Sequence, residues 1–228
     1  MSGRRVGDEL PIVTLKAAIT LDGRMATRSG GSKWITGEAA RREGHRMRSR
    51  SDAIVVGVGT VLADDPELTV RLVRGRNPLR VVLDSRARTP LSSKLVRTAK
   101  STPTLIFHAA TAPATRLSKL QAAGVQLHRI GVLKAGGLNL RTALRALGRR
   151  GCRSVMVEGG PTLHGALIER RLADRVAIFI APRILADAAG LPLAIGRKKH
   201  SMNQAWGLSD VRRRSFGDDT LIMGSLSR

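Results

Sequence analysis

The most informative cluster of residue types lies at 155–163, where an apolar, strand-like run meets a glutamate, two glycines and a proline. Glu158 directly follows the apolar residues, and Gly159, Gly160 and Pro161 precede a predicted helix. Exposed backbone N–H groups at such a turn, with the positive end of a helix dipole, stabilise phosphate groups. Ligands of open α/β sheets also bind at the carboxyl ends of strands. The pattern favours a phosphate-bearing ligand beside Glu158, although an ordinary turn whose glycines only supply positive φ angles fits as well.

A second glycine-containing element spans 57–66 and is less specific. It lacks the third glycine of a dinucleotide-binding fingerprint, and it lacks the Lys-Ser/Thr pair of a P-loop. Asp64 and Asp65 precede Pro66, an arrangement compatible with two catalytic carboxylates and equally with a solvated turn. Spacing alone does not decide between these interpretations.

Trp34 and three basic residues lie near these elements in the predicted organisation. Trp34 sits in a Gly/Ser-containing loop, where its indole ring could cover a nicotinamide or pyrimidine ring or could instead cap the core. Lys16, Arg48 and Arg71 are candidates for contacting a phosphate ester, which guanidinium groups bind in a bidentate manner. At this composition any single arginine is more often a surface residue.

Several kinds of chemistry have no sequence support. The pattern of a zinc-dependent base deaminase, His-x-Glu with Pro-Cys-x-x-Cys, is absent, and so is the Gly-x-Ser-x-Gly elbow of serine hydrolases. The single cysteine, Cys152, cannot form an internal disulfide or a cysteine-rich zinc site, so we expect no metal and an intracellular protein. An acidic pair near the start and the lack of a long apolar run predict no secretory signal, no membrane association and a cytoplasmic location.

The elements that must position these residues alternate between strands and helices along the chain. Helices are predicted from Thr36 as N-cap to about 51, and at 115–123, 140–149 and 162–171. Strands are predicted at 12–19, 52–56, 79–83, 104–108, 125–129, 154–157, 175–181, 208–216 and 220–225. This order predicts an α/β three-layer sandwich with a mainly parallel mixed sheet and a C-terminal antiparallel hairpin. We expect one domain over 1–228, with its core at about 10–225.

The charge of the chain is unusual. Lys and Arg number 40 against 17 Asp and Glu, a formal net charge of +23, which implies anionic partners. The cations are spread along the whole chain and aromatic residues make up only 2%, so few rings are available to stack on bases. We therefore expect steering of phosphorylated small molecules rather than specific nucleic-acid binding.

Taken together, these motifs resemble one family. The residues at 13–18, 21–24, 30–36, 52–57, 60–71, 82–85 and 157–163 are similar to the reductase domain of the bifunctional riboflavin-biosynthesis deaminase/reductase, which is related in fold to dihydrofolate reductase. The similarity runs from about 10 to 225, and the deaminase half has no counterpart here. The extreme basicity and the basic stretch 197–200 are not part of the family pattern.

The resemblance implies a reaction and a set of site residues. NADPH would transfer a hydride to the ribosyl group of 5-amino-6-(5-phosphoribosylamino)uracil, giving the ribitylamino product. The implied catalytic residues are Lys16 and Glu158. The implied substrate contacts are Ser32, Arg48, Leu68, Arg71 and Glu158, with Arg48 and Arg71 as phosphate anchors. The implied NADPH contacts are Ala18, Trp34, Thr60, Asp64, Ser85, Gly160, Pro161, Thr162, Leu163, His164, Gly165 and Ala166.

Partners and alternatives complete the set of expectations. The resemblance implies a homodimer, although the sequence carries no interface signal. A dihydrofolate or dihydropterin reductase on the same scaffold is the first alternative, since Glu158 could serve as the carboxylate that such a ligand needs. A basic nucleic-acid-binding protein on an inactive reductase fold is the second. The choice between NADPH and NADH, and between a deaminated and an undeaminated pyrimidine, stays open.

Overall fold

The computed structural model describes residues 10–133, 136–197 and 201–227, which form two compact units interleaved along the sequence. Unit 1 is built from Ser51–Leu68 and Pro78–Val155 with the N-terminal residues as far as Ile12. Unit 2 is built from Val13–Arg50, Thr69–Asn77 and the residues from Met156 onward. That 1–228 is a single domain stays a prediction.

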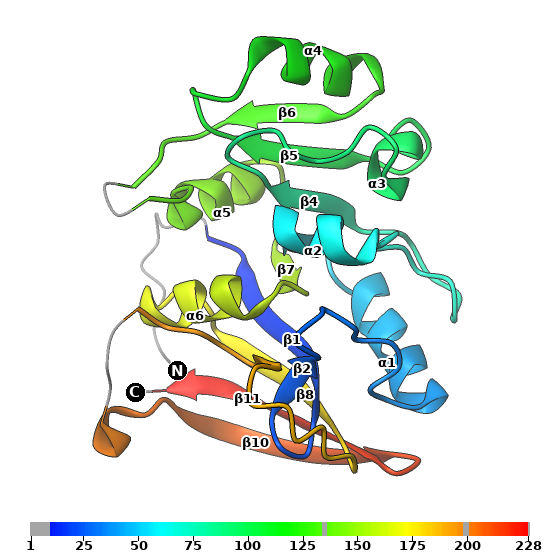
Figure 1. The fold of residues 1–228 in the computed structure, drawn as a ribbon, viewed down its shortest axis with the longest axis vertical. Helices are drawn as coiled ribbons and strands as arrows, with labels where there is room; N and C mark the ends of the chain where they lie inside the picture. Colours follow the sequence, from blue (N-terminus) through cyan, green and yellow to red (C-terminus); the bar gives the residue numbers. More distant parts are fainter. Residues whose placement is uncertain (1–9, 134–135, 198–200, 228) are drawn as a thin grey trace. The chain divides into compact units, whose positions relative to one another are not determined.

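Unit 1 contains a parallel sheet, seen in the upper half of Figure 1. Its strands pair in the order β3 (Ala53–Gly57), β4 (Leu79–Leu83), β5 (Thr104–His108) and β6 (Gln126–Arg129). Its helices are α2 (Val58–Asp64), α3 (Lys94–Arg97), α4 (Ala114–Ala122) and α5 (Leu140–Arg149). The β-branched residues of β3 and β4 are buried, which explains the mostly apolar sequence of these segments, with Arg80 of β4 as the exception.

Unit 2 contains a mixed sheet and the two helices that position most of the candidate site. Its strands pair in the order β10 (Gly207–Phe216), β11 (Asp219–Ser227), β8 (Arg175–Ala181) and β1 (Ile12–Thr20). A small antiparallel pair joins β2 (Arg24–Ala26) to β9 (Leu191–Pro192). Its helices are α1 (Glu38–Ser49), α6 (Pro161–Glu169) and the 3₁₀ turn η1 (Met202–Gln204). The remaining strand, β7 (Ser154–Val157), leads directly to Glu158.

Helix α1 packs on the sheet of unit 2 through a small apolar contact. Ala40 of α1 lies against Ala177 and Phe179 of β8 and Leu221 of β11, and all four are almost fully buried. A small side chain at position 40 lets the helix backbone come close to the strands. This contact fixes the helix that carries His45 and Arg48.

The predicted α/β fold with a mainly parallel mixed sheet is confirmed. β1 pairs with β8 in parallel, as do all neighbours within β3–β6, whereas β11 is antiparallel to β8 and to β10. Figure 1 shows β10 and β11 as the expected long C-terminal hairpin.

One local prediction was wrong and one helix was not predicted. The N-cap of α1 is Gly37, not Thr36, and the N–H of Gly37 donates to Asp219 Oδ2 at 2.7 Å. The residues after β3 form the unpredicted helix α2, which begins at Val58 with Gly57 as its N-cap in an extended conformation.

Unit 1 is held together around a buried arginine. Arg80 of β4 is completely buried, and its guanidinium donates to Thr98 Oγ1 at 2.8 Å and to the carbonyls of Leu95, Thr102 and Glu67. Burial lowers the pKa of Arg80 to about 10, an effect that the charge of Glu67 opposes, so the side chain stays charged at neutral pH. A buried cation is tolerated here because backbone carbonyls replace its water shell.

Arg80→Ala should therefore destabilise the protein severely. The change leaves several buried acceptors without a donor and removes a large side chain, so we expect a loss of about 3 kcal/mol or more in the free energy of unfolding. Urea denaturation measures it, and Arg97→Ala, which removes an exposed arginine of α3, serves as control with an expected effect within about 0.5 kcal/mol. Equal effects of the two changes would contradict the structural role of Arg80.

Candidate active site

The centre of the candidate site is an ion pair between Arg48 of α1 and Glu158, the residue after β7. Arg48 Nε donates to Glu158 Oε1 at 2.7 Å and Arg48 Nη2 donates to Oε2 at 2.8 Å, so the pairing is bidentate. Their side chains are only 15% and 12% exposed, which shields the pair from water. Burial would raise the pKa of Glu158, but Arg48 and then Lys16 outweigh that effect and bring the pKa to about 2. Glu158 is therefore a carboxylate at every physiological pH.

Lys16 of β1 is the second cation of this cluster. Its Nζ lies 5.5 Å from the centroid of the Phe179 ring, a cation–π contact, and 3.7 Å from where a Cβ on Gly44 of α1 would stand. Burial lowers the pKa of Lys16, Glu158 opposes this, and Arg48 lowers it further. A lysine with a depressed pKa gives up its proton more readily than one in water, which suits it to proton transfer.

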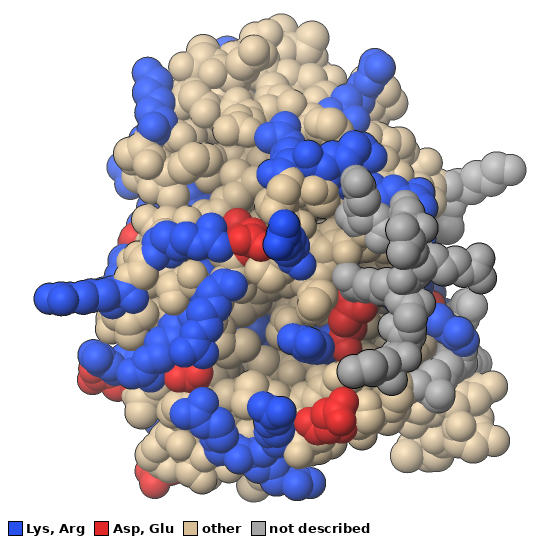
Figure 2. Space-filling view, turned by 180° about the vertical axis from the view of Figure 1, so that it is seen from behind, with Lys and Arg blue, Asp and Glu red and all other residues tan. Residues whose placement is uncertain are grey.

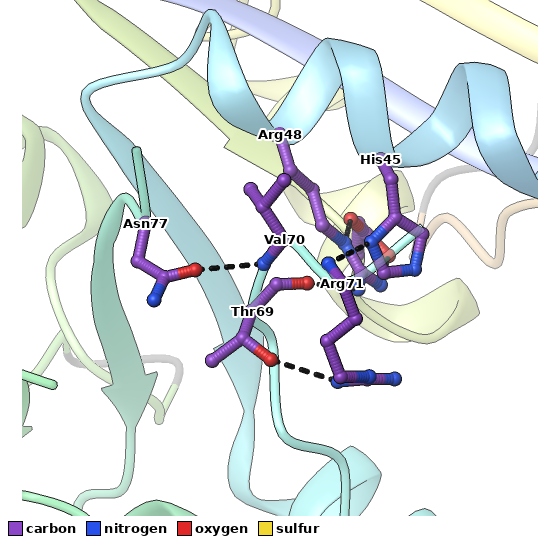
Figure 3. Close-up of polar contacts among 7 residues, drawn as sticks. His45, Arg48, Thr69, Val70, Arg71 and Asn77 are labelled. Carbon is purple, nitrogen blue, oxygen red and sulfur yellow. Dashed lines mark hydrogen bonds and ion pairs between the residues drawn. The ribbon is translucent and has the colours of Figure 1, made fainter. Parts of the chain in front are cut away.

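A segment without regular structure, 69–77, runs past this cluster and carries Arg71. Arg48 Nη1 donates to the Thr69 carbonyl at 3.1 Å, and the Val70 N–H donates to Asn77 Oδ1 at 2.8 Å (Figure 3). The Arg71 N–H donates to His45 Nδ1 at 2.9 Å, and Arg71 Nη1 donates to Thr69 Oγ1. The segment is thus bonded to α1 at Thr69 and Arg71 and to itself at Val70. The sequence analysis did not identify His45 as a partner of this segment.

The predicted cofactor turn 160–166 coincides with the first turns of α6. Gly160 is the N-cap with φ −76°, and Pro161 begins the helix, where its missing N–H costs nothing. Neither Gly159 nor Gly160 has a positive φ angle, so the alternative that they serve only to permit one is wrong. A Cβ at Gly160 would meet no protein atom within 4 Å, which leaves open space beside the helix N-terminus for a ligand to approach the backbone.

The rest of that turn faces a neighbouring strap, defined here as 193–197. His164 is fully buried and its Nδ1 bonds to the Leu193 carbonyl at 3.1 Å. A Cβ on Gly165 would stand 2.0 Å from the Ile195 carbonyl oxygen. His164 therefore bonds to the strap, and Gly165 allows the strap backbone to approach α6 closely. Of the other residues, Thr162 is exposed, and Leu163 and Ala166 are partly exposed.

The other predicted residues of unit 2 lie at the edges of this region. Trp34 is 63% exposed, so the alternative that it caps the core is wrong. Its ring lies 4.5 Å from the Arg41 guanidinium carbon, and its carbonyl accepts from Arg183 Nη1. Ser32 is partly exposed in the same loop, and Ala18 of β1 packs against the apolar contact beneath α1.

Four predicted residues belong to unit 1. Thr60 and Asp64 lie on α2 and are partly exposed, Ser85 follows β4, and Leu68 is buried with φ +53°. Asp84 fixes the turn that carries Ser85 by accepting from both the N–H and the hydroxyl of Thr89. Asp65 accepts from the N–H of Lys94 at the start of α3, so this carboxylate has a structural partner and the turn interpretation fits it better than a catalytic one.

The described residues contain neither a metal-binding cluster nor a membrane-spanning helix. No group of three His, Cys, Asp or Glu side chains among them could hold a metal ion. None of the helices in the described ranges is long and apolar enough to cross a membrane.

Comparison with known proteins decides the family. The model of the RibD C-terminal domain matches residues 11–221. The chain belongs to this family. RibD C-terminal domain relatives include the riboflavin biosynthesis protein RibD of Aquifex aeolicus, 38% identical over 219 residues that make up 95% of this chain and 58% of that protein. The 2,5-diamino-6-ribosylamino-4(3H)-pyrimidinone 5′-phosphate reductase of Methanothermobacter thermautotrophicus is 38% identical over 93% of this chain and 96% of its own length.

Solved structures agree with the family. RibD of Acinetobacter baumannii superposes with a TM-score of 0.80 at 30% identity, covering 96% of this chain and 59% of that one. The chain spans little more than half the length of the RibD proteins that it matches.

The low pKa of Glu158 predicts how stability of this RibD C-terminal domain depends on pH. A carboxyl whose pKa is about 2 in the fold and near 4.5 when unfolded stabilises the fold fully above pH 4.5, and that contribution is lost as pH falls toward 2. Glu158→Gln should remove this dependence, so the stability difference between the parent and the variant should shrink as pH falls from 5 to 2. Chemical denaturation at several pH values tests this, with Glu38→Gln, an exposed carboxyl of α1, as control. A difference that is constant with pH would contradict the ion pair.

The strap predicts opposite outcomes for two glycines of α6. Gly165→Ala should cost about 1–3 kcal/mol, because its Cβ would collide with backbone atoms of Ile195 that cannot move aside cheaply. Gly160→Ala should leave stability unchanged or slightly raised, because its φ suits any residue and its Cβ meets open space. Thermal unfolding together with hydrogen exchange of the strap measures both, and a stable Gly165→Ala variant would refute the close contact.

Proposed function

We propose that the chain is an NADPH-dependent reductase of riboflavin biosynthesis that reduces the ribosyl group of 5-amino-6-(5-phosphoribosylamino)uracil to the ribitylamino product. The observation that carries the proposal is the cluster of Lys16, Glu158 and Arg48 beside the tied segment of Arg71. Membership of the RibD C-terminal domain family supports it, and so does the printed activity of the Methanothermobacter relative, which this chain matches over nearly its whole length.

On the substrate side, Arg71 is the proposed phosphate anchor. It is exposed, and its Nη1 is oriented by Thr69 Oγ1 on a segment that α1 holds in place. Arg48 is committed to Glu158 and to the Thr69 carbonyl, which favours a role in orienting the carboxylate and the segment as well as any phosphate contact. Ser32, Leu68 and Glu158 complete the proposed substrate contacts.

The reduction adds a hydride to the sugar carbon C1′. It also adds a proton to the neighbouring atom whose bond to C1′ is lowered in order. Bound NADPH would supply the hydride. Lys16, with its lowered pKa, is the proposed group that holds and passes a proton at Nζ, and the ionised Glu158 keeps that proton from being lost too easily. The protein also orients the reacting carbon through the phosphate anchor, which lowers the entropic barrier.

On the cofactor side, the open space at Gly160 and the exposed first turn of α6 fit the phosphates of a dinucleotide. Ala18, Trp34, Thr60, Asp64, Ser85 and the remaining residues of 160–166 are the other proposed contacts, His164 and Gly165 through their backbone alone. Lys and Arg side chains are spread over the face in Figure 2 and far outnumber the acidic ones. Such a surface attracts the additional phosphate that distinguishes NADPH from NADH.

The proposed setting is a cytoplasmic homodimer. The alternative of a dihydrofolate or dihydropterin reductase finds less support, because both Glu158 oxygens accept from Arg48 and are not presented to an amidine group. A nucleic-acid-binding role finds less support too, because the basic side chains of Figure 2 do not gather in one stripe.

The deciding experiment follows NADPH oxidation with 5-amino-6-(5-phosphoribosylamino)uracil, with dihydrofolate and NADH in parallel assays. We expect turnover with the phosphoribosyl substrate and a fall in kcat of about 100-fold or more in Glu158→Gln, because the variant loses the charge that balances Lys16. Glu38→Gln should retain the parent kcat. Turnover of dihydrofolate alone would overturn the proposal, and so would parent-like kinetics of Glu158→Gln.

A further inference from the structure

His45 stands out as a buried polar residue to which the resemblance assigns no role. It is 8% exposed and lies on the buried side of α1 next to Gly44, three residues before Arg48. Its Nδ1 accepts a hydrogen bond from a backbone N–H 26 residues further along the chain, that of Arg71. A buried imidazole used as a backbone acceptor replaces the ladder hydrogen bond that an irregular segment lacks.

The bond matters because of where it falls on the segment 69–77. Three successive residues of this segment are tied at their backbone: Thr69 to Arg48, Val70 to Asn77 and Arg71 to His45. Figure 3 shows His45 and Arg48 reaching from the same side of α1, as residues three apart on a helix do. Gly75 is pressed against Ser49 of α1 as well, since a Cβ there would stand 2.5 Å from the Ser49 Cβ. One turn of α1 therefore fixes the position of the Arg71 backbone.

The bond also fixes the chemical form of His45. A ring nitrogen accepts a hydrogen bond only when it carries no proton, so the proton of the neutral ring is on Nε2. Burial and the charges of Arg48, Arg71 and Lys16 lower the pKa of His45 to about 4, with Glu158 opposing them. The charges that act on this ring therefore come from four places: α1, the segment 69–77, β1 and the residue after β7. Together with burial, their net effect on the pKa keeps the ring neutral at pH 7.

We propose that His45 is a positioning residue for substrate binding, whose neutral ring holds the Arg71 backbone so that the guanidinium meets the substrate's phosphate. The inference rests on the proposed function, because it takes Arg71 as the phosphate anchor. His45 itself touches neither the phosphate nor the reacting carbon. Its effect should appear in KM for the phosphorylated substrate and should leave kcat nearly unchanged.

The test is a double-mutant cycle. KM and kcat are measured for Arg71→Ala, His45→Leu and the double variant, with the phosphorylated substrate and with its dephosphorylated analogue. We expect Arg71→Ala to raise KM by about 10- to 100-fold, as for loss of a charge-assisted contact. His45→Leu should raise KM by about 10-fold, and the double variant should be no worse than Arg71→Ala. With the dephosphorylated analogue, His45→Leu should have no effect on KM.

Two controls separate positioning from stability. His45→Gln keeps an acceptor oxygen and should restore most of the parent KM. His128→Leu removes a partly buried histidine of unit 1 that packs against Phe107 and should leave KM unchanged. If His45→Leu fails to fold, ¹⁵N spectra of the parent protein decide, since they should show a neutral ring with its proton on Nε2 at pH 7.

The outcomes are distinguishable. An unchanged KM in Arg71→Ala would overturn the phosphate role of Arg71 and the inference with it. A raised KM in Arg71→Ala with a parent KM in His45→Leu would overturn the inference alone. The inference alone would also be overturned if the increases in KM of the two single variants multiplied in the double variant. A ring that is protonated on Nδ1 at pH 7 would overturn it as well.

Discussion

The bidentate pair of Arg48 and Glu158 is the interaction on which the chemistry of unit 2 depends. Arg48 is the largest influence that opposes the rise in the pKa of Glu158 caused by burial, and without it the carboxylate would lose both its hydrogen-bond donors in the pair and its nearest opposing charge. With it, the carboxylate is ionised, fixed in direction and able to act on Lys16. Because Arg48 also donates to the Thr69 carbonyl, the same guanidinium orients the Glu158 carboxylate and the segment that carries Arg71. Charge and geometry therefore cannot be changed independently at this position.

The position of helix α1 is fixed by one packing contact, and α1 in turn positions Arg48. Ala40 fits closely against β8 and β11, and the following turns present Gly44, His45 and Arg48 to the site. Gly44 lies beside Lys16, since a Cβ there would stand 3.7 Å from the Lys16 Nζ, an ordinary contact distance. The many arginines of this helix would lead one to expect exposure to water on all sides. Within α1, however, only Glu38, Ala39, Arg42 and Arg46 are exposed. Its buried side consists of two small residues, Ala40 and Gly44, with the Glu43 carboxylate and the His45 imidazole, and it lacks a stripe of large apolar residues.

The sequence predicted most of the fold, because burial of β-branched strands leaves a continuous apolar pattern. The strand 104–108 and the helix 140–149 match the structure residue for residue. Helix α2 was not predicted, because two glycines, Gly57 and Gly59, are unfavourable in a helix, whereas Gly57 caps the helix from an extended conformation. The position of Glu158 at the end of a strand was predictable, but its pairing with Arg48 across 110 residues depends on tertiary packing. His45 gave no periodic signal, and only its place beside Gly44 on an otherwise charged helix hinted at burial.

The neutrality of His45 follows first from its burial and then from the charges that surround it. Two basic side chains, Lys16 and Arg48, already face one carboxylate before Arg71 is counted. A further cation in the ring would add repulsion on three sides and would place a proton between Nδ1 and the Arg71 N–H. The positive charge of the cluster is thus available to attract an anionic ligand, while the ring adjacent to it serves as an acceptor. In a chain with a net charge of +23, a neutral His45 can do what a further cation could not, because only an unprotonated ring nitrogen can accept the Arg71 N–H.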